Sequence, residues 1–452
     1  MLKDAERHRI ARVVEELRRH FDAGHAQPLR WRQRQLTGLL KFCYEQRTAI
    51  LRALSADLGK PAQEAMAADV LSVGMEIASL KFNLKRYLRP QKVPSPLMLQ
   101  PAASYIHKDP LGVVLIIGAW NYPVQLTLIP LAGAIAAGNC AVVKPSEIAP
   151  HTSDLLANRL GDYIDSDCIR IVEGGPEETQ TLLAQRFDHI FYTGNGTIGR
   201  VVMNAASENL TPVTLELGGK SPCIVDTTAD LDVTARRIAL GKFMNAGQTC
   251  IAPDYALVHQ KVESELLECL KATIRDFYGS DPQRSKRYAR IVNERHFERV
   301  SRFLNDGELV VGGESDRDDL YIAPTVIRNV TPQSPVMSEE IFGPVLPVLS
   351  VDSMDEALAF VRGRPKPLAC YLFTRDQHLQ RRAVKTTSSG GMCINHTVMH
   401  AGNQSLPFGG VGPSGMGSYH GRRTFDTFVH QKAVLKKPFW LDAGFFYPKS
   451  SG

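Results

Sequence analysis

The chain has 452 residues, of which 44% are hydrophobic and 22% charged, and its formal net charge is +6. This length exceeds what one ordinary hydrophobic core organises, so we expect two or three domains of soluble globular type. Lysine and arginine are interspersed with acidic residues throughout, which argues against a nucleic-acid-binding protein.

Cysteine usage predicts a reducing compartment. The eight cysteines are scattered and form no Cys-x-x-Cys pair, a pattern typical of neither a zinc ribbon nor a disulfide framework. The charged, helix-patterned start lacks the apolar core of a secretory signal, so we expect a cytoplasmic protein. The longest apolar stretch, residues 126–143, is broken by Pro130 and predicts a buried helix and strand rather than a transmembrane anchor.

Helices are predicted for the first ninety residues, where apolar residues recur on one face. Four prolines between residues 90 and 101 then predict an extended stretch. Beyond it, strands alternate with helices. Strands are expected at residues 113–119, 140–143, 169–172, 189–192 and 213–217, and helices at 127–137, around 153–163, 176–185 and 198–206.

Uniformly apolar strands separated by short helices predict a parallel sheet covered on both faces. Such sheets bind ligands outside the carboxyl ends of their strands. The residues at those ends are Asn121, Lys144, Glu147, Gly194 and Glu216, and we expect cofactor chemistry among them.

A second strand–helix alternation begins at residues 222–225 and predicts a second α/β domain. This domain carries Cys250. Cys250 and Glu216 would then face each other across a domain interface.

Cys250 ends a Gly-Gln-Thr-Cys tetrapeptide, and Glu216 opens the run ELGGKSP. Covalent catalysis needs such a pair, a thiol that forms an adduct and a carboxylate that activates water to release it. Each residue also has a simpler interpretation. Most cysteines are small buried apolar residues, and a glutamate can merely pair with a lysine.

The run YTGNGTIG contains Gly194-x-Gly196-x-x-Gly199 between a predicted strand and helix, where backbone can approach a phosphate closely. A lone match is weak, because a structural turn explains it nearly as well. In the run KPSE, Lys144 would reach ribose hydroxyls, and Glu147 would accept from a 2′-hydroxyl while repelling a 2′-phosphate.

Three further segments have a chemical and a structural interpretation. Asn121 in WNYP would donate to an oxyanion together with the Cys250 backbone N–H, or cap a strand-end turn. Glu340 and Phe342 in EEIFGPV would hold a ribose and a nicotinamide, or form a strand-entry turn. The glycine-rich loop 406–415 would serve as a wall that lets other chains pack closely. His396 and His400 have the spacing of helical metal ligands, but their surroundings predict a loop and no third ligand is evident, so we expect no metal.

Taken together, WNYP, KPSE, YTGNGTIG, ELGGKSP, FMNAGQTC, EEIFGPV and LPFGGVGPSGMG resemble, in order, the motifs of the aldehyde dehydrogenase superfamily. The resemblance is strongest from about residue 113 to about residue 428 and is closest to the class 3, or fatty and aromatic aldehyde, branch. It implies a Rossmann-type parallel-sheet cofactor domain (1–90 and 111–217), a catalytic α/β domain (218–420), and a bridging and oligomerisation element (91–110 and 421–452).

The resemblance also implies residue roles. Cys250 matches the nucleophile, Glu216 the general base and Asn121 the oxyanion donor. Those expected to bind the cofactor, NAD with NADP also accepted, are Lys144, Glu147, Gly194, Asn195, Gly199, Leu217, Glu340 and Phe342. Tyr122, Met244 and Ile251 flank the catalytic positions and are expected to line an apolar substrate tunnel.

Two departures qualify this assignment. The turn reads Gly194-Asn195-Gly196-Thr197 where relatives show Gly-Ser-Thr, so we expect a backbone N–H or the Asn195 amide to replace a lost hydroxyl contact. In the class 3 branch the division of labour between the two glutamates is less settled, so the base is expected to be either Glu216 alone or Glu216 together with Glu340.

The sequence hypothesis is therefore an NAD(P)-dependent dehydrogenase that oxidises medium- or long-chain aliphatic or aromatic aldehydes to carboxylic acids through a cysteine thioester. Its partners would be the aldehyde and a second copy of the chain in a homodimer. The alternatives are a CoA-acylating relative, against which Glu216 argues, and a catalytically silent structural protein on this scaffold. The aromatic tail after Lys437 would pack in the dimer, extend the tunnel mouth or touch a membrane surface.

Overall fold

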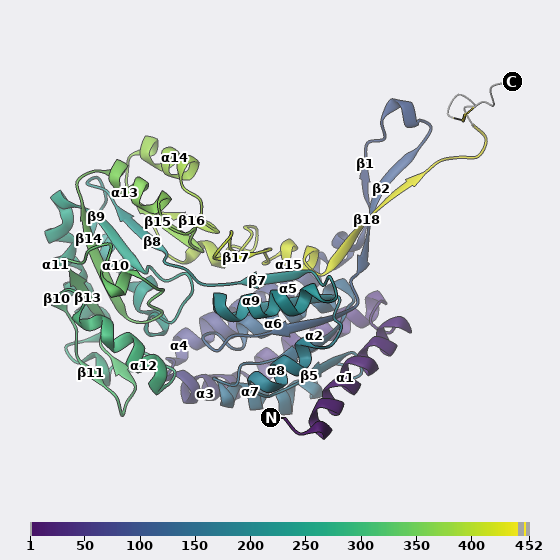
Figure 1. Ribbon diagram of the computed structural model, residues 1–452, viewed down its shortest axis with the longest axis horizontal. Coiled ribbons are helices and arrows are strands. Elements are labelled where there is room, and N and C mark those ends of the chain that lie inside the picture. The colour runs from purple at the N-terminus through teal and green to yellow at the C-terminus, as the bar shows by residue number, and fades with distance from the viewer. Residues whose placement is uncertain (1, 442–446, 449–452) are drawn as a thin grey trace.

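The computed structural model describes residues 2–441 and 447–448 (Figure 1). Two α/β bodies lie side by side, and a narrow arm of strands projects from one of them. The predictions for the aromatic tail fall partly on residues 442–446 and 449–452, which lie outside the described residues.

The first ninety residues are helical, as predicted. Their apolar faces are buried in the same core as the first sheet, with Ile10, Leu17, Leu39 and Leu54 fully inaccessible. The elements are α1 (Asp4–Asp22), α2 (Leu29–Glu45), α3 (Arg47–Leu58), α4 (Ala62–Ala65), a π-helix η1 (Met66–Leu71) and α5 (Ser72–Leu88).

The first sheet has six strands in the order β17-β7-β6-β3-β4-β5, all parallel except β17. The three strands β3, β4 and β6 are buried at every residue, which confirms the expected covered parallel sheet. The strands are β3 (Val113–Ile117), β4 (Cys140–Lys144), β5 (Ile169–Ile171), β6 (His189–Thr193), β7 (Val213–Glu216) and β17 (Gly415–Met416), and the helices α6 (Gln125–Ala137), α7 (Pro150–Arg159), α8 (Pro176–Leu183), α9 (Gly196–Ser207) and α15 (Arg422–Asp426).

The second sheet has seven strands in the order β10-β13-β14-β9-β8-β15-β16, parallel except for β10, and forms its own hydrophobic core. Its strands are β8 (Pro222–Val225), β9 (Tyr255–His259), β10 (Glu308–Val311), β13 (Thr325–Arg328), β14 (Val345–Val351), β15 (Ala369–Phe373) and β16 (Gly391–Ile394). Its helices are α10 (Leu231–Phe243), α11 (Gln260–Tyr278), α12 (Glu294–Ser301), α13 (Met354–Arg362) and α14 (Gln377–Thr386), and β11 (Ser315–Asp316) and β12 (Tyr321–Ile322) form a separate two-stranded ribbon.

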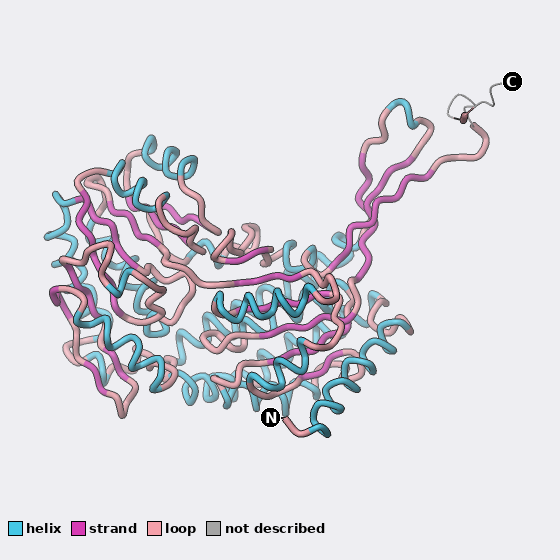
Figure 2. The backbone as a smooth tube through the Cα atoms, in the orientation of Figure 1, coloured by secondary structure: helices cyan, strands magenta, loops and turns pink. Residues whose placement is uncertain are grey.

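The arm is a three-stranded antiparallel sheet of β1 (Gln91–Val93), β2 (Ala103–Pro110) and β18 (Val429–Lys436) (Figure 2). Strand β18 pairs with β2 along its whole length, so the proline-rich stretch and the C-terminal segment form one unit. A short 3-10 helix, Leu97–Leu99, closes the hairpin between β1 and β2.

The chain returns to the first body before it forms β18, the last strand of the arm. Strand β17 pairs with β7, and Tyr419, Phe425 and Phe428 are buried in the core of the first sheet. Within the described residues, no helix combines the length and the apolar character needed to cross a membrane.

Candidate active site

One cavity of about 1280 Å³ is lined by residues of both α/β bodies. It collects all but one of the residues predicted for the site: Asn121, Tyr122, Lys144, Glu147, Gly194, Asn195, Glu216, Leu217, Met244, Cys250, Ile251, Glu340 and Phe342. The exception is Gly199, which is buried in α9. A Cβ added there would lie 3.0 Å from the Leu217 side chain, so Gly199 allows the helix to pack closely on β7.

The strand register brings the cofactor side of the cavity together. Lys144, at the end of β4, is the register partner of Ile117 at the end of β3. Glu216, at the end of β7, is the register partner of Thr193 at the end of β6. The carboxyl ends of four neighbouring strands therefore meet at one edge of the sheet, where the alternating pattern predicted a binding site.

The segment before Cys250 has an unusual backbone. Within the 3-10 segment η4 (Met244–Gly247), the φ angles of Asn245, Ala246 and Gly247 are 53°, 50° and 75°. Left-handed conformations are costly for the two residues that carry a Cβ, and such strain persists only where the surroundings hold it. Glycine at 247 and asparagine at 245 are residue types that tolerate this conformation, whereas alanine at 246 is not.

Gln248 supplies much of that hold. Its Nε2 donates to the carbonyls of Asn245 and Arg290, both at 2.9 Å, and its Oε1 accepts from the Val292 N–H at 3.0 Å. All three bonds are buried or partly buried, so the loop that presents Cys250 is anchored on the second α/β body.

Asn121 follows β3 and is 4% exposed. Its Nδ2 donates to the Gln248 carbonyl at 3.1 Å, and its own carbonyl accepts from Asn245 Nδ2 at 2.9 Å. An amide nitrogen carries two hydrogens, so one remains for another acceptor. Asn121 is thus bonded to the loop that carries Cys250 through both its side-chain amide and its backbone carbonyl.

Glu216 is 3% exposed, and neither of its carboxylate oxygens has a hydrogen-bond partner among the described residues. Burial raises the pKa of this carboxyl well above its usual value. Cys250 is partly buried on the same cavity wall. Burial, and then the charges of Glu340 and Glu216, raise the pKa of its thiol, so the resting thiol is protonated at neutral pH.

Glu340 is held against the segment that follows Glu216. A Cβ added to Gly218 would overlap the Glu340 carboxylate, and the Gly219 N–H donates to that carboxylate. Burial, and then the charge of Asp254, raise the pKa of Glu340 to about 8. Only a glycine at 218 allows this approach.

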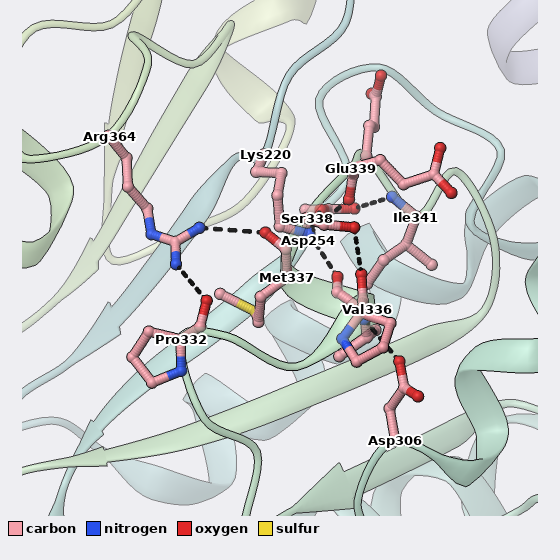
Figure 3. Close-up of polar contacts among 12 residues, drawn as sticks. Lys220, Asp254, Asp306, Pro332, Val336, Met337, Ser338, Glu339, Ile341 and Arg364 are labelled. Carbon is pink, nitrogen blue, oxygen red and sulfur yellow. Dashed lines mark hydrogen bonds and ion pairs between the residues drawn. The ribbon is translucent and has the colours of Figure 1, made fainter.

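A polar network fixes the segment that carries Glu340 (Figure 3). Lys220 Nζ pairs with Asp254 at 2.5 Å and donates to the carbonyls of Val336 and Glu339 at 2.9 Å and 2.8 Å. Asp254 in turn accepts from the Ile341 N–H at 3.0 Å. Lys220 and Asp254 together connect the segment after β7 of the first sheet to the loop at residues 336–341 of the second α/β body.

Phe342 has a φ of 45°, and its ring meets that of Trp120 edge to face at 5.3 Å. Arg299 stabilises the same turn, because its guanidinium donates to the carbonyls of Glu340 and Ile341. The aromatic ring is thereby held on the cavity wall beside Glu340.

The residues at the other end of the cavity fit a dinucleotide. Lys144 Nζ pairs with Glu147 at 2.6 Å, which places a cation and an anion together at the end of β4. Asn195 is the N-cap of α9, and its Oδ1 accepts from the Ile198 N–H at 3.0 Å. The Asn195 Oδ1 therefore caps the helix, while the Asn195 Nδ2 and the helix-start backbone N–H groups other than that of Ile198 are donors available for a phosphate.

The substrate side of the cavity is largely apolar. Tyr122, Met244 and Ile251 all line it, and the Tyr122 hydroxyl bonds Thr249 beside Cys250 at 2.8 Å. The sequence did not indicate several other lining residues, because all of them except Phe408 lie outside the motifs: Met75, Leu126, Ile129, Val398, Met399 and Phe408.

The remaining sequence candidates lie outside this chemistry. His396 Nδ1 bonds only to the backbone of Thr397, and within the described ranges no group of three or more His, Cys, Asp or Glu side chains is arranged to hold a metal ion. In the glycine-rich loop, Gly415 pairs with Glu216, and a Cβ on Gly415 would lie 2.2 Å from the Leu215 carbonyl. The loop is a close-packed wall, as predicted.

Comparison with known proteins agrees with this geometry. The model of the aldehyde dehydrogenase family matches residues 1–434. The chain is 50% identical to aldehyde dehydrogenase family 3 member A2 of Rattus norvegicus over 428 residues, which are 95% of this chain and 88% of the relative. It is 46% identical to the rat "Aldehyde dehydrogenase, dimeric NADP-preferring", over 95% of this chain and 94% of the relative.

A solved structure, the substrate-bound state of Staphylococcus aureus AldH, superposes with a TM-score of 0.95 at 45% identity, covering 100% of this chain and 98% of that one. The chain belongs to the aldehyde dehydrogenase family. It is an NAD(P)-dependent enzyme that oxidises aldehydes.

Proposed function

We propose that this enzyme oxidises medium- or long-chain aliphatic or aromatic aldehydes to carboxylic acids through a covalent thioester on Cys250. The Cys250 thiol releases its proton to solvent water, and its sulfur bonds to the aldehyde carbon as the C=O π pair moves to the oxygen. That oxygen receives hydrogen bonds from the Asn121 amide and the Cys250 backbone N–H. A nicotinamide held by Glu340 and Phe342 would supply the hydride acceptor, and the hydride would leave this carbon with its bonding electrons. A thioester then remains on Cys250.

Glu216 is assigned as the base that takes a proton from water. The resulting hydroxide adds to the thioester carbon, the C–S bond breaks, and the carboxylic acid leaves. The observation that carries the proposal is the buried Glu216 carboxyl, whose two oxygens have no partner among the described residues, on the cavity wall that also holds Cys250. Glu340 is the second candidate, but its carboxylate already accepts from the Gly219 N–H.

The cofactor assignment within the NAD(P) class favours NAD. Glu147 lies on the cavity wall as an anion paired with Lys144, and this carboxylate would repel a 2′-phosphate. NADP remains a candidate, because the Lys144 ammonium beside it would attract the same phosphate.

The apolar lining supports the substrate class. Met75 and Leu126 extend the apolar surface beyond Tyr122, Met244 and Ile251, and such walls bind hydrocarbon by removing it from water. Release of the acyl group to CoA is the alternative, and the presence of a water-activating carboxyl at Glu216 argues against it. We also propose a homodimer, which the exposed apolar end of the arm supports.

The test is acyl-enzyme capture with Glu216→Gln, using saturated aldehydes of increasing chain length with NAD and with NADP. We expect one equivalent of reduced cofactor in a burst, slow turnover afterwards, and an acyl mass addition on the Cys250 peptide. Cys250→Ser should give neither burst nor adduct while still binding NAD. Burst rates that rise with chain length support the substrate class.

Three outcomes would contradict the proposal. Rapid steady turnover by Glu216→Gln would remove Glu216 from the base role. Acyl-CoA formation by the wild type would establish the alternative. A preference for the shortest aldehyde would exclude medium- and long-chain aliphatic aldehydes as the proposed substrates.

A further inference from the structure

A fully buried ion pair lies behind the oxyanion donor. The side chains of Lys60 and Asp69 are both 0% exposed, and Lys60 Nζ lies 3.0 Å from Asp69 Oδ2. Lys60 follows α3, and Asp69 belongs to the π-helix η1. Neither residue belongs to a motif that the sequence indicated.

Lys60 directs its other contacts at the segment that contains Asn121. Its Nζ donates to the Asn121 carbonyl at 2.9 Å and lies 4.0 Å from the centre of the Tyr122 ring. Asp69 Oδ1 accepts from the Gln125 N–H at 3.3 Å. The ammonium thus contacts a carboxylate, a carbonyl and an aromatic face, and it also interacts electrostatically with the partly buried Glu64 carboxyl.

These contacts complete a chain of bonds that ends at the nucleophile loop. The Asn121 carbonyl accepts from Lys60 and from Asn245, while the Asn121 amide donates to the Gln248 carbonyl. The backbone of Asn121 is therefore held on one side by an ammonium from the helical region and on the other by the loop that carries Cys250. Rotation of the Asn121 peptide would break both attachments.

Fold stability alone is a weak explanation for such a pair. Desolvation of two charges usually cancels their attraction, and apolar residues of similar volume serve a core as well. A role in fixing the geometry of the site explains the Lys60–Asp69 pair better. The π-helix η1, which carries Asp69, is a rare conformation that often occurs at functional sites.

We propose that Lys60 is a positioning residue that sets the orientation of the Asn121 amide, and through it the rate at which Cys250 adds to the aldehyde. This inference rests on the proposed oxyanion role of Asn121. A small misplacement of a group that contacts the transition state slows a reaction by up to about a hundredfold, so the effect falls on the chemical step rather than on cofactor binding.

The test is a double-mutant cycle with Lys60→Met, Asn121→Ala and the combined variant, read by the rate of the first burst of reduced cofactor. We expect Asn121→Ala to slow the burst by on the order of a hundredfold and Lys60→Met by about ten- to a hundredfold. The combined variant should be no slower than Asn121→Ala, because Lys60 acts through that amide. Quenching of protein fluorescence by NAD should report unchanged cofactor affinity in all three.

Lys108→Met is the matched control. Lys108 pairs with Asp426 at 3.5 Å, its side chain is 2% exposed, and its Nζ lies 5.7 Å from the Phe425 ring. Unlike Lys60, it makes these contacts away from Asn121. This variant should lose stability, as we also expect for Lys60→Met, without slowing the burst. If Lys60→Met fails to fold, the cycle is repeated in an Asp69→Asn background, which removes the unpaired carboxylate and keeps an acceptor for the Gln125 N–H.

Additive losses in the combined variant would overturn the inference, since Lys60 would then act independently of Asn121. A wild-type burst rate in Lys60→Met, alongside a slow Asn121→Ala, would overturn it as well. In either case the proposed function would stand. An Asn121→Ala enzyme with a wild-type burst would remove the oxyanion role and the positioning role together.

Discussion

At the scale of single residues, the Cys250 thiol lies near two carboxyl groups, Glu340 and Glu216, whose charges raise its pKa. Glu340, with its pKa raised to about 8 by burial and by Asp254, is uncharged over most of the neutral range. Above about pH 8 it becomes an anion that opposes ionisation of the Cys250 thiol. Ionisation of either group therefore raises the pKa of the other.

Glu340→Gln should make Cys250 more reactive in alkaline solution. Removal of the Glu340 charge lowers the pKa of the thiol, so more thiolate is present at a given pH above about 8, while below that pH little changes because Glu340 is already neutral. The measurement is the rate of Cys250 alkylation by iodoacetamide against pH, read by mass spectrometry of its peptide.

Glu339→Gln is the control for this titration, because the Glu339 side chain is 54% exposed and pairs with Arg299 at 3.8 Å. It should keep the wild-type profile. Superimposable profiles for all three proteins would mean that the charge of Glu340 does not reach the thiol.

At the scale of elements, the site residues at the strand ends were predictable from the sequence. The turns and buried contacts that hold these residues in place were not. Lys144 and Glu216 each close an apolar run, so the sequence places them at the edge of a parallel sheet. The left-handed turn at Asn245 and Ala246 was not predictable from local sequence, because asparagine only tolerates that conformation and alanine disfavours it. The turn exists because tertiary hydrogen bonds stabilise it. The buried position of Lys60 likewise depends on contacts with residues distant in sequence.

The Lys220 network is a second such support, and it predicts a cofactor-binding defect. Lys220→Met removes the donor to the Val336 and Glu339 carbonyls, which loosens the loop that presents Glu340 (Figure 3). A lost charge-assisted hydrogen bond costs about 1.5 to 3 kcal/mol, so the Kd of NAD should rise by roughly tenfold or more. Fluorescence titration measures it.

Lys432→Met provides the comparison, because Lys432 forms an ion pair with Asp109 at 2.7 Å on the arm and its side chain is 52% exposed. Its Kd for NAD should equal that of the wild type. An unchanged Kd in Lys220→Met would show that Asp254 and Arg299 hold the loop without it.

At the scale of the whole molecule, the arm ends in apolar side chains that nothing in the described chain covers. Leu97 and Met98 are 89% and 71% exposed at the tip of the hairpin, and Phe439 and Trp440, just beyond β18, are 104% and 77% exposed. Exposed apolar groups gathered at one projecting end are typical of an interaction surface. A second copy of the chain is the partner that we propose.

The variant Leu97→Asp with Met98→Asp should therefore dissociate the proposed homodimer. Each of these side chains contributes about 1.5 to 3 kcal/mol when buried, and a two-fold symmetric interface counts each contact twice. Light scattering coupled to gel filtration, at several protein concentrations, measures the mass. Leu210→Asp is the control, because Leu210 is equally exposed, at 89%, in the turn after α9. A monomeric wild type, or a double variant that keeps its dimeric mass, would assign the apolar tip to another partner.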